Sequence, residues 1–166
     1  NSGMSEVELR LQRLSDAKRF FKILSNPNFV FFGAKPKSIE AEKEWLKKGF
    51  EKRKKNLEHN YAITYDGKLI GGCGIKINQH RTFIGEIGYF VDEEYWGKGV
   101  ATKATKLLEK IAFKMGIIRI EIVMQPANKG SVKVAKKCGY VKEGKLRKAI
   151  SHLGKYEDVY LYSKVK

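Results

Sequence analysis

The segment from Phe83 to Met115 constrains the fold more than any other part of the sequence. Alternating apolar residues predict a strand over 83–91, and an amphipathic pattern predicts a helix over 98–115, with a short link between them. The apolar face of that helix repeats at the helical period and consists of Val100, Ala104, Leu107, Leu108, Ile111 and Ala112. A strand that runs directly into such a helix predicts a sheet with a helix packed on one face.

The remaining elements alternate as in a single α/β domain. Ser15 and Ser38 are expected to cap helices, and Gly139 is expected to end one. The expected strands span 7–14, 61–65, 68–77, 83–91, 118–124, 140–151 and 156–163, and the expected helices span 16–24, 39–54, 98–115 and 131–138. A meander followed by a βαβ crossover predicts a mixed sheet with helices on its faces over residues 4–166. Residues 1–3 look like the remnant of a tag.

Turn and loop signals separate these elements. The pair Asp66-Gly67 predicts a two-residue hairpin between consecutive strands. The expected loop over 25–37 is unusually apolar, because Phe29, Val30, Phe31 and Phe32 lie within it. Such a loop lines either the edge of the core or a substrate cavity, and Phe31 and Phe32 are the candidates for contact with a substrate.

The link between the central strand and helix reads YWGKGVAT at 95–102. Gly97 and Gly99 lack Cβ atoms, so the backbone can come close to a bulky anion. The free N–H groups and the dipole at a helix N-terminus favour a pyrophosphate, and Lys98 adds positive charge. The spacing is not that of a P-loop, and Thr102 stands where the dinucleotide-binding fingerprint needs a third glycine. For the motif taken alone, a plain strand-to-helix turn is the alternative.

Charge and cysteine usage narrow the function classes. There are 34 lysines and arginines against 18 acidic residues, a net charge of +16 that favours an anionic ligand or an acidic partner, although a solvated Lys-rich surface accounts for most of the lysines. No apolar run approaches the ~20 residues that span a bilayer, and the start of the chain lacks the apolar stretch of a signal peptide. Cys73 and Cys138 predict neither a disulfide scaffold nor a metal site, and they favour a cytoplasmic protein.

Two longer strings resemble the core motifs of the GCN5-related N-acetyltransferase (GNAT) superfamily. The first runs from 85 to 105 and contains EIGYFVD at 86–92, and the second runs from Asn128 to Tyr140. The resemblance covers 7–165 in the family's order of elements. It is closest to the branch that acetylates the N-termini of ribosomal proteins, with polyamine acetyltransferases nearby. It implies a mixed, mostly antiparallel sheet of about seven strands with helices on both faces.

The resemblance implies acetyl-CoA as the cofactor. The strand end would pair with the pantetheine arm, a backbone N–H near Phe90 would point at the thioester oxygen, and the turn amides would hold the pyrophosphate. The implied cofactor-binding residues are Tyr89, Phe90, Val91, Gly97, Lys98, Gly99, Val100, Ala101, Thr102, Asn128 and Ser131. Trp96 stands where the family pattern usually has Gln or Arg, which removes one polar contact.

Proton transfer departs from the usual family pattern. Glu86 is the candidate base, with an ion pair to one of the many lysines as the alternative. Ala135 stands where many members have a tyrosine acid, whereas Ser131 matches the serine that serves as acid in the ribosomal-protein branch, with helix capping as its alternative. Tyr89 and Tyr156 are reserve acids, and Tyr156 is also a candidate for contact with the substrate. Part of that branch uses a carboxylate as base, and the matching position in this sequence, near Ile150, has no carboxylate.

The expected activity is direct transfer of an acetyl group to a primary amine, at a protein or peptide N-terminus. A polyamine or other small amine is the alternative acceptor, although the charge of +16 disfavours polycations unless a local acidic pocket exists. The basic run over 47–55 motivates a second alternative, a CoA-binding factor associated with RNA or the ribosome. Nucleic acid is a minor expectation, because that run lacks interleaved aromatic residues. A homodimer is expected by analogy alone.

Overall fold

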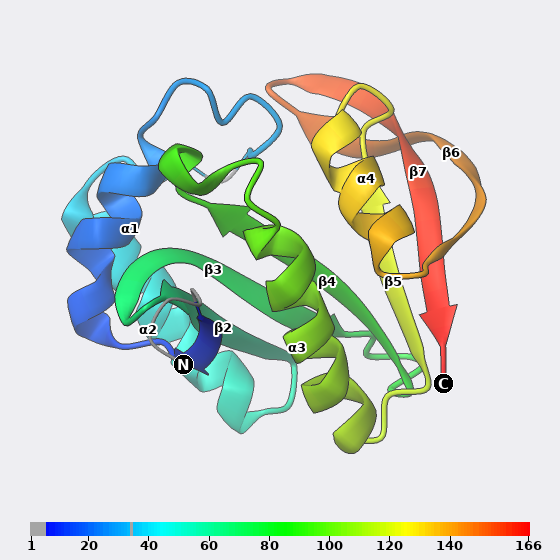
Figure 1. Cartoon of the computed structure of the whole chain (residues 1–166), viewed down its shortest axis with the longest axis horizontal. Coiled ribbons are helices and arrows are strands. Elements are labelled where there is room, and N and C mark those ends of the chain that lie inside the picture. Colours follow the sequence, from blue (N-terminus) through cyan, green and yellow to red (C-terminus); the bar gives the residue numbers. More distant parts are fainter. Residues whose placement is uncertain (1–5, 34) are drawn as a thin grey trace.

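The computed structural model describes residues 6–33 and 35–166, and the expected tag remnant at 1–3 lies outside the described residues. The chain forms a seven-stranded sheet in the order β1-β2-β3-β4-β5-β7-β6 (Figure 1). The strands are β1 (Val7–Leu11), β2 (Glu58–Tyr65), β3 (Lys68–Ile77), β4 (Ile84–Val91), β5 (Arg119–Met124), β6 (Val141–His152) and β7 (Lys155–Val165). The helices are α1 (Ala17–Leu24), α2 (Ile39–Lys54), α3 (Val100–Lys114) and α4 (Lys129–Lys137), with short 3₁₀ turns η1 (Leu14–Asp16) and η2 (Glu93–Tyr95). Only the β4–β5 pair is parallel among the described strands, which confirms the expected mostly antiparallel sheet.

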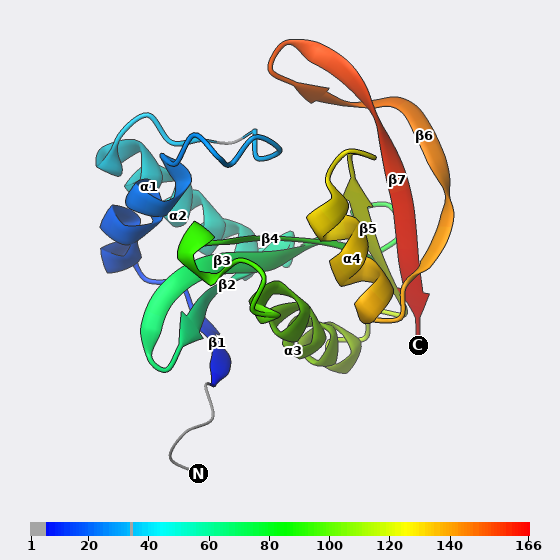
Figure 2. The same cartoon turned by 45° about the horizontal axis from the view of Figure 1, so that its top comes forward.

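Helices cover both faces of the sheet, as expected. α1 and α2 pack on each other and on one face, where Phe20, Leu46 and Ala62 form a buried cluster. α3 and α4 lie on the other face, where Leu108 and Ile120 belong to the main core (Figure 2). Each helix turns its apolar stripe to the sheet, so most of its charged residues remain on the outside; Glu42 of α2 and Glu109 of α3 are buried exceptions. Within the described part of the chain, no helix is long and apolar enough to cross a membrane.

Local signals place several boundaries where the sequence predicts them. The Ser38 hydroxyl accepts a hydrogen bond from the Ala41 amide at 3.0 Å, and α2 begins at the next residue after Ser38. Asp66 and Gly67 have φ angles of 49° and 83°, which match the two-residue hairpin expected between β2 and β3. Gly139 has a φ angle of 81° just after α4, as expected for a helix-ending glycine.

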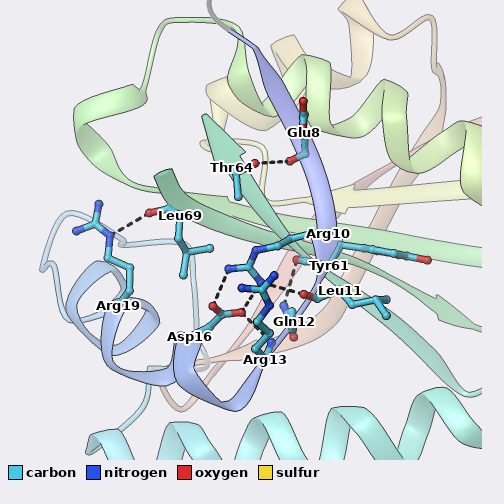
Figure 3. Close-up of polar contacts among 10 residues, drawn as sticks. All are labelled: Glu8, Arg10, Leu11, Gln12, Arg13, Asp16, Arg19, Tyr61, Thr64 and Leu69. Carbon is cyan, nitrogen blue, oxygen red and sulfur yellow. Dashed lines mark hydrogen bonds and ion pairs between the residues drawn. The ribbon is translucent and has the colours of Figure 1, made fainter. Parts of the chain in front are cut away.

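The start of α1 differs from the sequence-based prediction. Ser15 does not cap the helix, because it lies inside η1 and Asp16 occupies the N-cap position. The Asp16 carboxylate instead accepts hydrogen bonds from the Arg13 amide at 2.8 Å and from Arg10 at 2.8 and 3.0 Å (Figure 3). These bonds require the chain to turn soon after Arg10, so β1 ends at Leu11 rather than at residue 14.

Glycines in β3 make room for neighbouring side chains. A Cβ atom on Gly72 would lie 2.7 Å from the Phe90 ring, and one on Gly74 would meet the Asn60 side chain. The register between β2 and β3 also shifts at Ile63 and Thr64. The Phe90 ring therefore lies flat against β3 on the α1 side, where it packs edge-on against Phe20 with 5.3 Å between ring centroids.

Candidate active site

The parallel strands β4 and β5 separate in the middle of the sheet. Their ladder runs only from Ile84 opposite Arg119 to Glu86 opposite Glu121. Beyond that point β4 continues to Val91 and β5 continues to Met124 without pairing to each other. Both strands keep their outer partners, β3 and β7. The separation leaves a gap between two central strands, and the backbone groups that face it are available to a ligand.

Hydrogen-bond alternation identifies the β4 backbone groups that face this gap. The Asp92 amide donates to the Ile70 carbonyl at 2.7 Å, and the Asn78 amide donates to the Ile84 carbonyl at 2.9 Å. Even-numbered residues of β4 therefore direct their N–H and C=O groups to β3. It follows that the amide of Phe90 belongs to the β3 ladder. The amides that face the gap near this position are those of its neighbours, Tyr89 and Val91.

Trp96 fixes the exit from β4. Its indole N–H donates to the Val91 carbonyl at 2.7 Å, so this carbonyl is not available to a ligand. Its ring also packs edge-on against Phe29, with 5.3 Å between centroids. The residue that departs from the usual family pattern therefore has a structural role, which the sequence did not indicate.

The turn after β4 presents open backbone at the start of α3. Gly97 and Gly99 have φ angles of 76° and 75°, which explains glycine at both positions, and a Cβ on either would meet nothing within 4 Å. The first helical bond of α3 joins the Lys103 amide to the Gly99 carbonyl at 3.0 Å. The amides of residues 100–102 consequently have no partner inside the helix. Lys98 lies beside them with its Nζ 5.3 Å from the centre of the Tyr95 ring.

The geometry of the turn fits a pyrophosphate. Three outward-facing amides and the positive end of a fifteen-residue helix meet at an unobstructed surface. The helix begins at Val100, two residues later than the sequence predicts, because Gly99 is the left-handed N-cap. The later start leaves the glycines in the loop, where they shape the approach to these amides.

A tyrosine and a serine meet across the gap. The Tyr89 hydroxyl lies 3.0 Å from the Ser131 hydroxyl of α4. Asn128 caps α4 by accepting a hydrogen bond from the Ser131 amide at 3.3 Å, which leaves its amide nitrogen for other partners. Burial raises the pKa of Tyr89 more than the bond to Ser131 lowers it, so the phenol holds its proton at neutral pH. Helix capping is therefore performed by Asn128, and the Ser131 hydroxyl points to Tyr89 instead.

Glu86 lies where β4 and β5 begin to separate. Its partners across the sheet are Lys76 on β3 and Glu121 on β5. Glu86 is exposed overall, and partial loss of hydration where it lies between the strands raises the pKa of its carboxyl; Lys76 opposes this shift and Glu121 adds to it. Among the described residues no cation lies within 4.0 Å of the Glu86 carboxylate, so the alternative of a close ion pair is not found.

Glu86 and Tyr89 occupy opposite faces of β4. Side chains alternate along a strand, so Glu86 shares its face with Phe90, which packs under α1. Tyr89 shares the other face with Val91, which packs in the core beneath α3. The gap between β4 and β5 therefore connects the Glu86 carboxylate on the α1 side with the Tyr89–Ser131 hydroxyl pair on the α3 side.

The apolar loop between α1 and α2 is held over the exit from β4. The side chains of Asn26 and Asn28 donate to the Glu93 carboxylate at 2.8 to 3.0 Å. Phe32 packs against Phe90 with 5.6 Å between ring centroids, whereas Phe31 is 38% exposed. Of the two candidates for substrate contact, Phe32 contributes to packing and Phe31 alone has a largely free face.

The tip of the β6–β7 hairpin reaches this loop. The His152 Nε2 atom lies 2.9 Å from the Val30 carbonyl, although the two residues are 122 positions apart in the sequence. No local sequence pattern indicates this contact. Tyr156, at the same tip, is 73% exposed and has no polar contact among the described side chains. Nearer the gap, Gln125 donates to the Glu157 carboxylate at 3.4 Å.

The two cysteines are buried in the core next to Tyr89, and His59 lies away from the gap. Burial raises the pKa of the Cys73 thiol to about 12, which argues against a nucleophile, and Cys138 is also buried. His59 contacts Asn56 at 2.6 Å and Arg53 at 3.4 Å near the end of α2. Burial and the Arg53 charge lower the pKa of His59. The described residues contain no cluster of ligands that could hold a metal ion.

Comparison with known proteins agrees with this geometry. The acetyltransferase (GNAT) domain family matches residues 6–141. The sequence is 33% identical over 125 residues to the "Probable N-acetyltransferase YjcK" of Bacillus subtilis (strain 168), which covers 73% of this chain and 69% of that protein.

Two solved structures share the fold over almost the whole chain. The ribosomal-protein-S5-alanine acetyltransferase from Vibrio fischeri is 27% identical, with a TM-score of 0.85 over 98% of this chain and 96% of that one. The microcin C7 self-immunity acetyltransferase MccE, solved with acetyl-CoA and AMP, is 25% identical, with a TM-score of 0.89 over 97% and 93% of the two chains. The chain therefore belongs to the GNAT family of acetyltransferases, and it is an N-acetyltransferase that uses acetyl-CoA as its cosubstrate.

Proposed function

We propose that this enzyme acetylates the α-amine at the N-terminus of a protein or peptide. The observation that carries the mechanism is the gap between β4 and β5, with the Tyr89–Ser131 pair on one face and Glu86 on the other. Bound acetyl-CoA supplies an activated acetyl thioester. The protein has to hold that donor, orient an amine against it, remove a proton from the amine and return one to the sulfur.

On the α3 side, the amides of residues 100–102 and Lys98 bind the pyrophosphate of the donor. Its pantetheine arm lies along the unpaired edge of β4, where the amides of Tyr89 and Val91 face the gap. The free side-chain nitrogen of Asn128 donates to the same arm. One of the two gap-facing amides, which lie on either side of Phe90, then stabilises negative charge on the thioester oxygen.

On the α1 side, Glu86 takes the proton from the incoming ammonium group. A carboxyl whose pKa is raised is a better base near neutral pH than an ordinary glutamate, because its conjugate acid lies closer to the working pH. Glu86 is also held at the narrow end of the gap by the last β4–β5 pair, so it stands close to where the strands admit a substrate.

The leaving sulfur receives its proton from the Tyr89–Ser131 pair. Ser131, in the first turn of α4, donates its proton to the sulfur. Tyr89 then donates its own proton to Ser131, because the two oxygen atoms are 3.0 Å apart. Because its pKa is raised, Tyr89 stays protonated at neutral pH, so the pair has a proton to donate. This arrangement supplies an acid in a chain that has Ala135 where many relatives have a tyrosine.

The acceptor assignment rests on the full-length similarity to an enzyme that acts on the alanine of ribosomal protein S5. The hairpin tip and the loop that meet at His152 and Val30 lie over the acceptor side, so an extended chain end enters more easily than a folded surface.

A small cationic amine is the second candidate acceptor. Glu86, Glu121 and Glu157 lie on the acceptor side, and neither Glu86 nor Glu157 has an ion-pair partner among the described residues. Carboxylates on that side are the local negative charge that a polycation needs on a protein of charge +16.

A direct competition separates the two acceptors. Release of free thiol from acetyl-CoA is measured with a peptide that begins with alanine or serine, with the same peptide blocked at its N-terminus, and with spermidine. We expect turnover of the free peptide only. Equal or faster turnover of spermidine favours the small-amine acceptor, and turnover of the blocked peptide through a lysine side chain contradicts N-terminal specificity.

A further inference from the structure

Four lysines form a stripe along the outer side of α3. Lys103, Lys106, Lys110 and Lys114 follow one another at spacings of three and four residues, which places them on one side of the helix over about 16 Å. All four are exposed. In the part of the chain that the structure describes, none of them lies within 4.0 Å of a carboxylate. The one carboxylate of α3, on Glu109, is buried and pairs with Lys164 at 3.1 Å.

The basic run of α2 is different, although the sequence singled it out. Lys47 pairs with Glu44, Lys54 pairs with Glu51, and Lys52 pairs with Glu58, each at 3.2 Å. Half of that run is therefore neutralised by neighbouring carboxylates. Among the described residues, lysines without such partners also lie on the opposite face of the sheet, on α3 and on α4, where Lys129, Lys133, Lys136 and Lys137 are exposed (Figure 1 shows the two helices).

The stripe ends in a hollow with apolar surroundings. Its open volume is about 480 Å³, and the lining residues are Lys110, Ile111, Phe113, Lys114 and Lys166. The Lys166 amide donates to the Ile118 carbonyl, and the Ile118 amide donates to the Phe83 carbonyl, so the three strand ends lie side by side. Phe83 is 49% exposed and Ile118 is 53% exposed. Phe83 directly precedes β4, so its backbone lies beside the strand ends that border the hollow.

We propose that the α3 stripe and this hollow bind single-stranded nucleic acid. Lysine ammonium groups at regular spacing match successive phosphates, and the exposed Phe83 ring at the neighbouring strand ends offers a surface on which an unpaired base stacks. An acidic protein would pair with the same lysines, but it has no bases to stack on the exposed Phe83 ring. The hollow end of the surface is separate from the proposed donor site, because Lys114 lies about 21 Å along the helix from Val100, whereas Lys103 at the other end of the stripe lies next to that site.

Binding is measured by fluorescence anisotropy with a labelled single-stranded RNA of about ten nucleotides, on enzyme saturated with CoA so that the donor site is closed. We expect affinity that falls steeply with salt. The charge-reversed variant Lys106→Glu/Lys110→Glu/Lys114→Glu should lose about tenfold or more in affinity. The neutral variant with Gln at the same three positions should reduce the slope of log affinity against log salt by about 2, because each lost phosphate contact removes about 0.7 from that slope. Phe83→Ser should lose about fivefold or more.

A matched variant tests whether net charge alone is responsible. Lys47→Glu/Lys48→Glu/Lys55→Glu carries the same change of charge on α2 and should bind almost as the unchanged enzyme does. The proposal fails if both triple variants lose the same affinity, if polyglutamate displaces the RNA as well as unlabelled RNA does, or if the unchanged enzyme binds no RNA at physiological salt. Unaltered KM for acetyl-CoA in the α3 variants checks that the donor site and the fold are intact.

Discussion

Lys76 offers a way to test Glu86 as the base without removing it. The two residues are directly opposite on β3 and β4, and their charged groups are more than 4.0 Å apart. Taking about 6 Å between charges, the attraction is about 0.7 kcal/mol in a water-like medium and about 2.8 kcal/mol at an effective dielectric constant of 20. Those energies correspond to about 0.5 and about 2 pH units, and the exposure of Glu86 favours the lower value.

The sign follows from the charge. Lys76 lowers the pKa of Glu86, so the neutral variant Lys76→Gln should raise that pKa. The acid limb of the kcat/KM profile for the acceptor should then move to higher pH by about 0.5 to 1 unit. Glu121 raises the pKa of Glu86, so Glu121→Gln should move the limb to lower pH. Its shift should be smaller, because Arg119 pairs with Glu121 at 2.8 Å and already offsets its charge.

The assay is the initial rate of thiol release as a function of pH, at subsaturating peptide and saturating acetyl-CoA. Lys68→Gln, at the far end of the same strand, carries the same charge change and should leave the limb in place. A limb that belongs to the enzyme must also stay in place when the peptide is exchanged for one whose amine has another pKa. The reasoning is refuted if Lys76→Gln and Lys68→Gln behave alike, or if Glu86→Gln retains the limb.

Three further predictions concern the donor site, the acid and the stability of the fold. Gly99→Asp should abolish acetyl-CoA binding in calorimetry, because φ is 75° and a negative charge would face the pyrophosphate, whereas Gly116→Asp, with φ of 98° beyond the other end of α3, should keep it. Tyr89→Phe and Ser131→Ala should each lower kcat about 100-fold with little change in KM for acetyl-CoA, and the double variant should be no worse than the poorer single one; additive losses would contradict a shared proton. Burial raises the pKa of Glu42 to about 7, so its contribution to stability is present when it is protonated and is lost as pH rises from about 4.5 through 7. Glu42→Gln should therefore raise the free energy of unfolding in urea by about 1 to 3 kcal/mol at alkaline pH and hardly at acidic pH, and an equal gain at both would contradict the assignment.

The donor side could be predicted from the sequence because its signals are local. Gly97 and Gly99 set the conformation of consecutive residues, and the amides that face the ligand follow directly after them. Ser38 and the Asp66-Gly67 pair likewise fixed a helix start and a hairpin through contacts within a few residues. Conformational preferences of this kind act over one turn of chain, so they remain readable without the rest of the fold.

The acceptor side could not be read in the same way, because it is assembled from distant segments. The contact of His152 with Val30 joins residues 122 positions apart, and no local pattern records it. The direction of the Phe90 amide depends on the register of β4 with β3, which only the assembled sheet determines. Roles assigned to Glu86 and Ser131 stay predictions, although the structure brings Ser131 to Tyr89.

The sequence by itself determined the order of the elements, their hydrophobic faces, and the glycine-rich turn that leads into α3, since each depends on periodicity or on residues next to one another. Tertiary structure alone decided where β4 and β5 separate, that Trp96 closes onto the Val91 carbonyl, and which lysines keep their charge uncompensated. The total charge of +16 is a property of the composition, whereas the lysines that keep their charge uncompensated, such as the stripe on α3, depend on which carboxylates the fold brings within reach of each ammonium group.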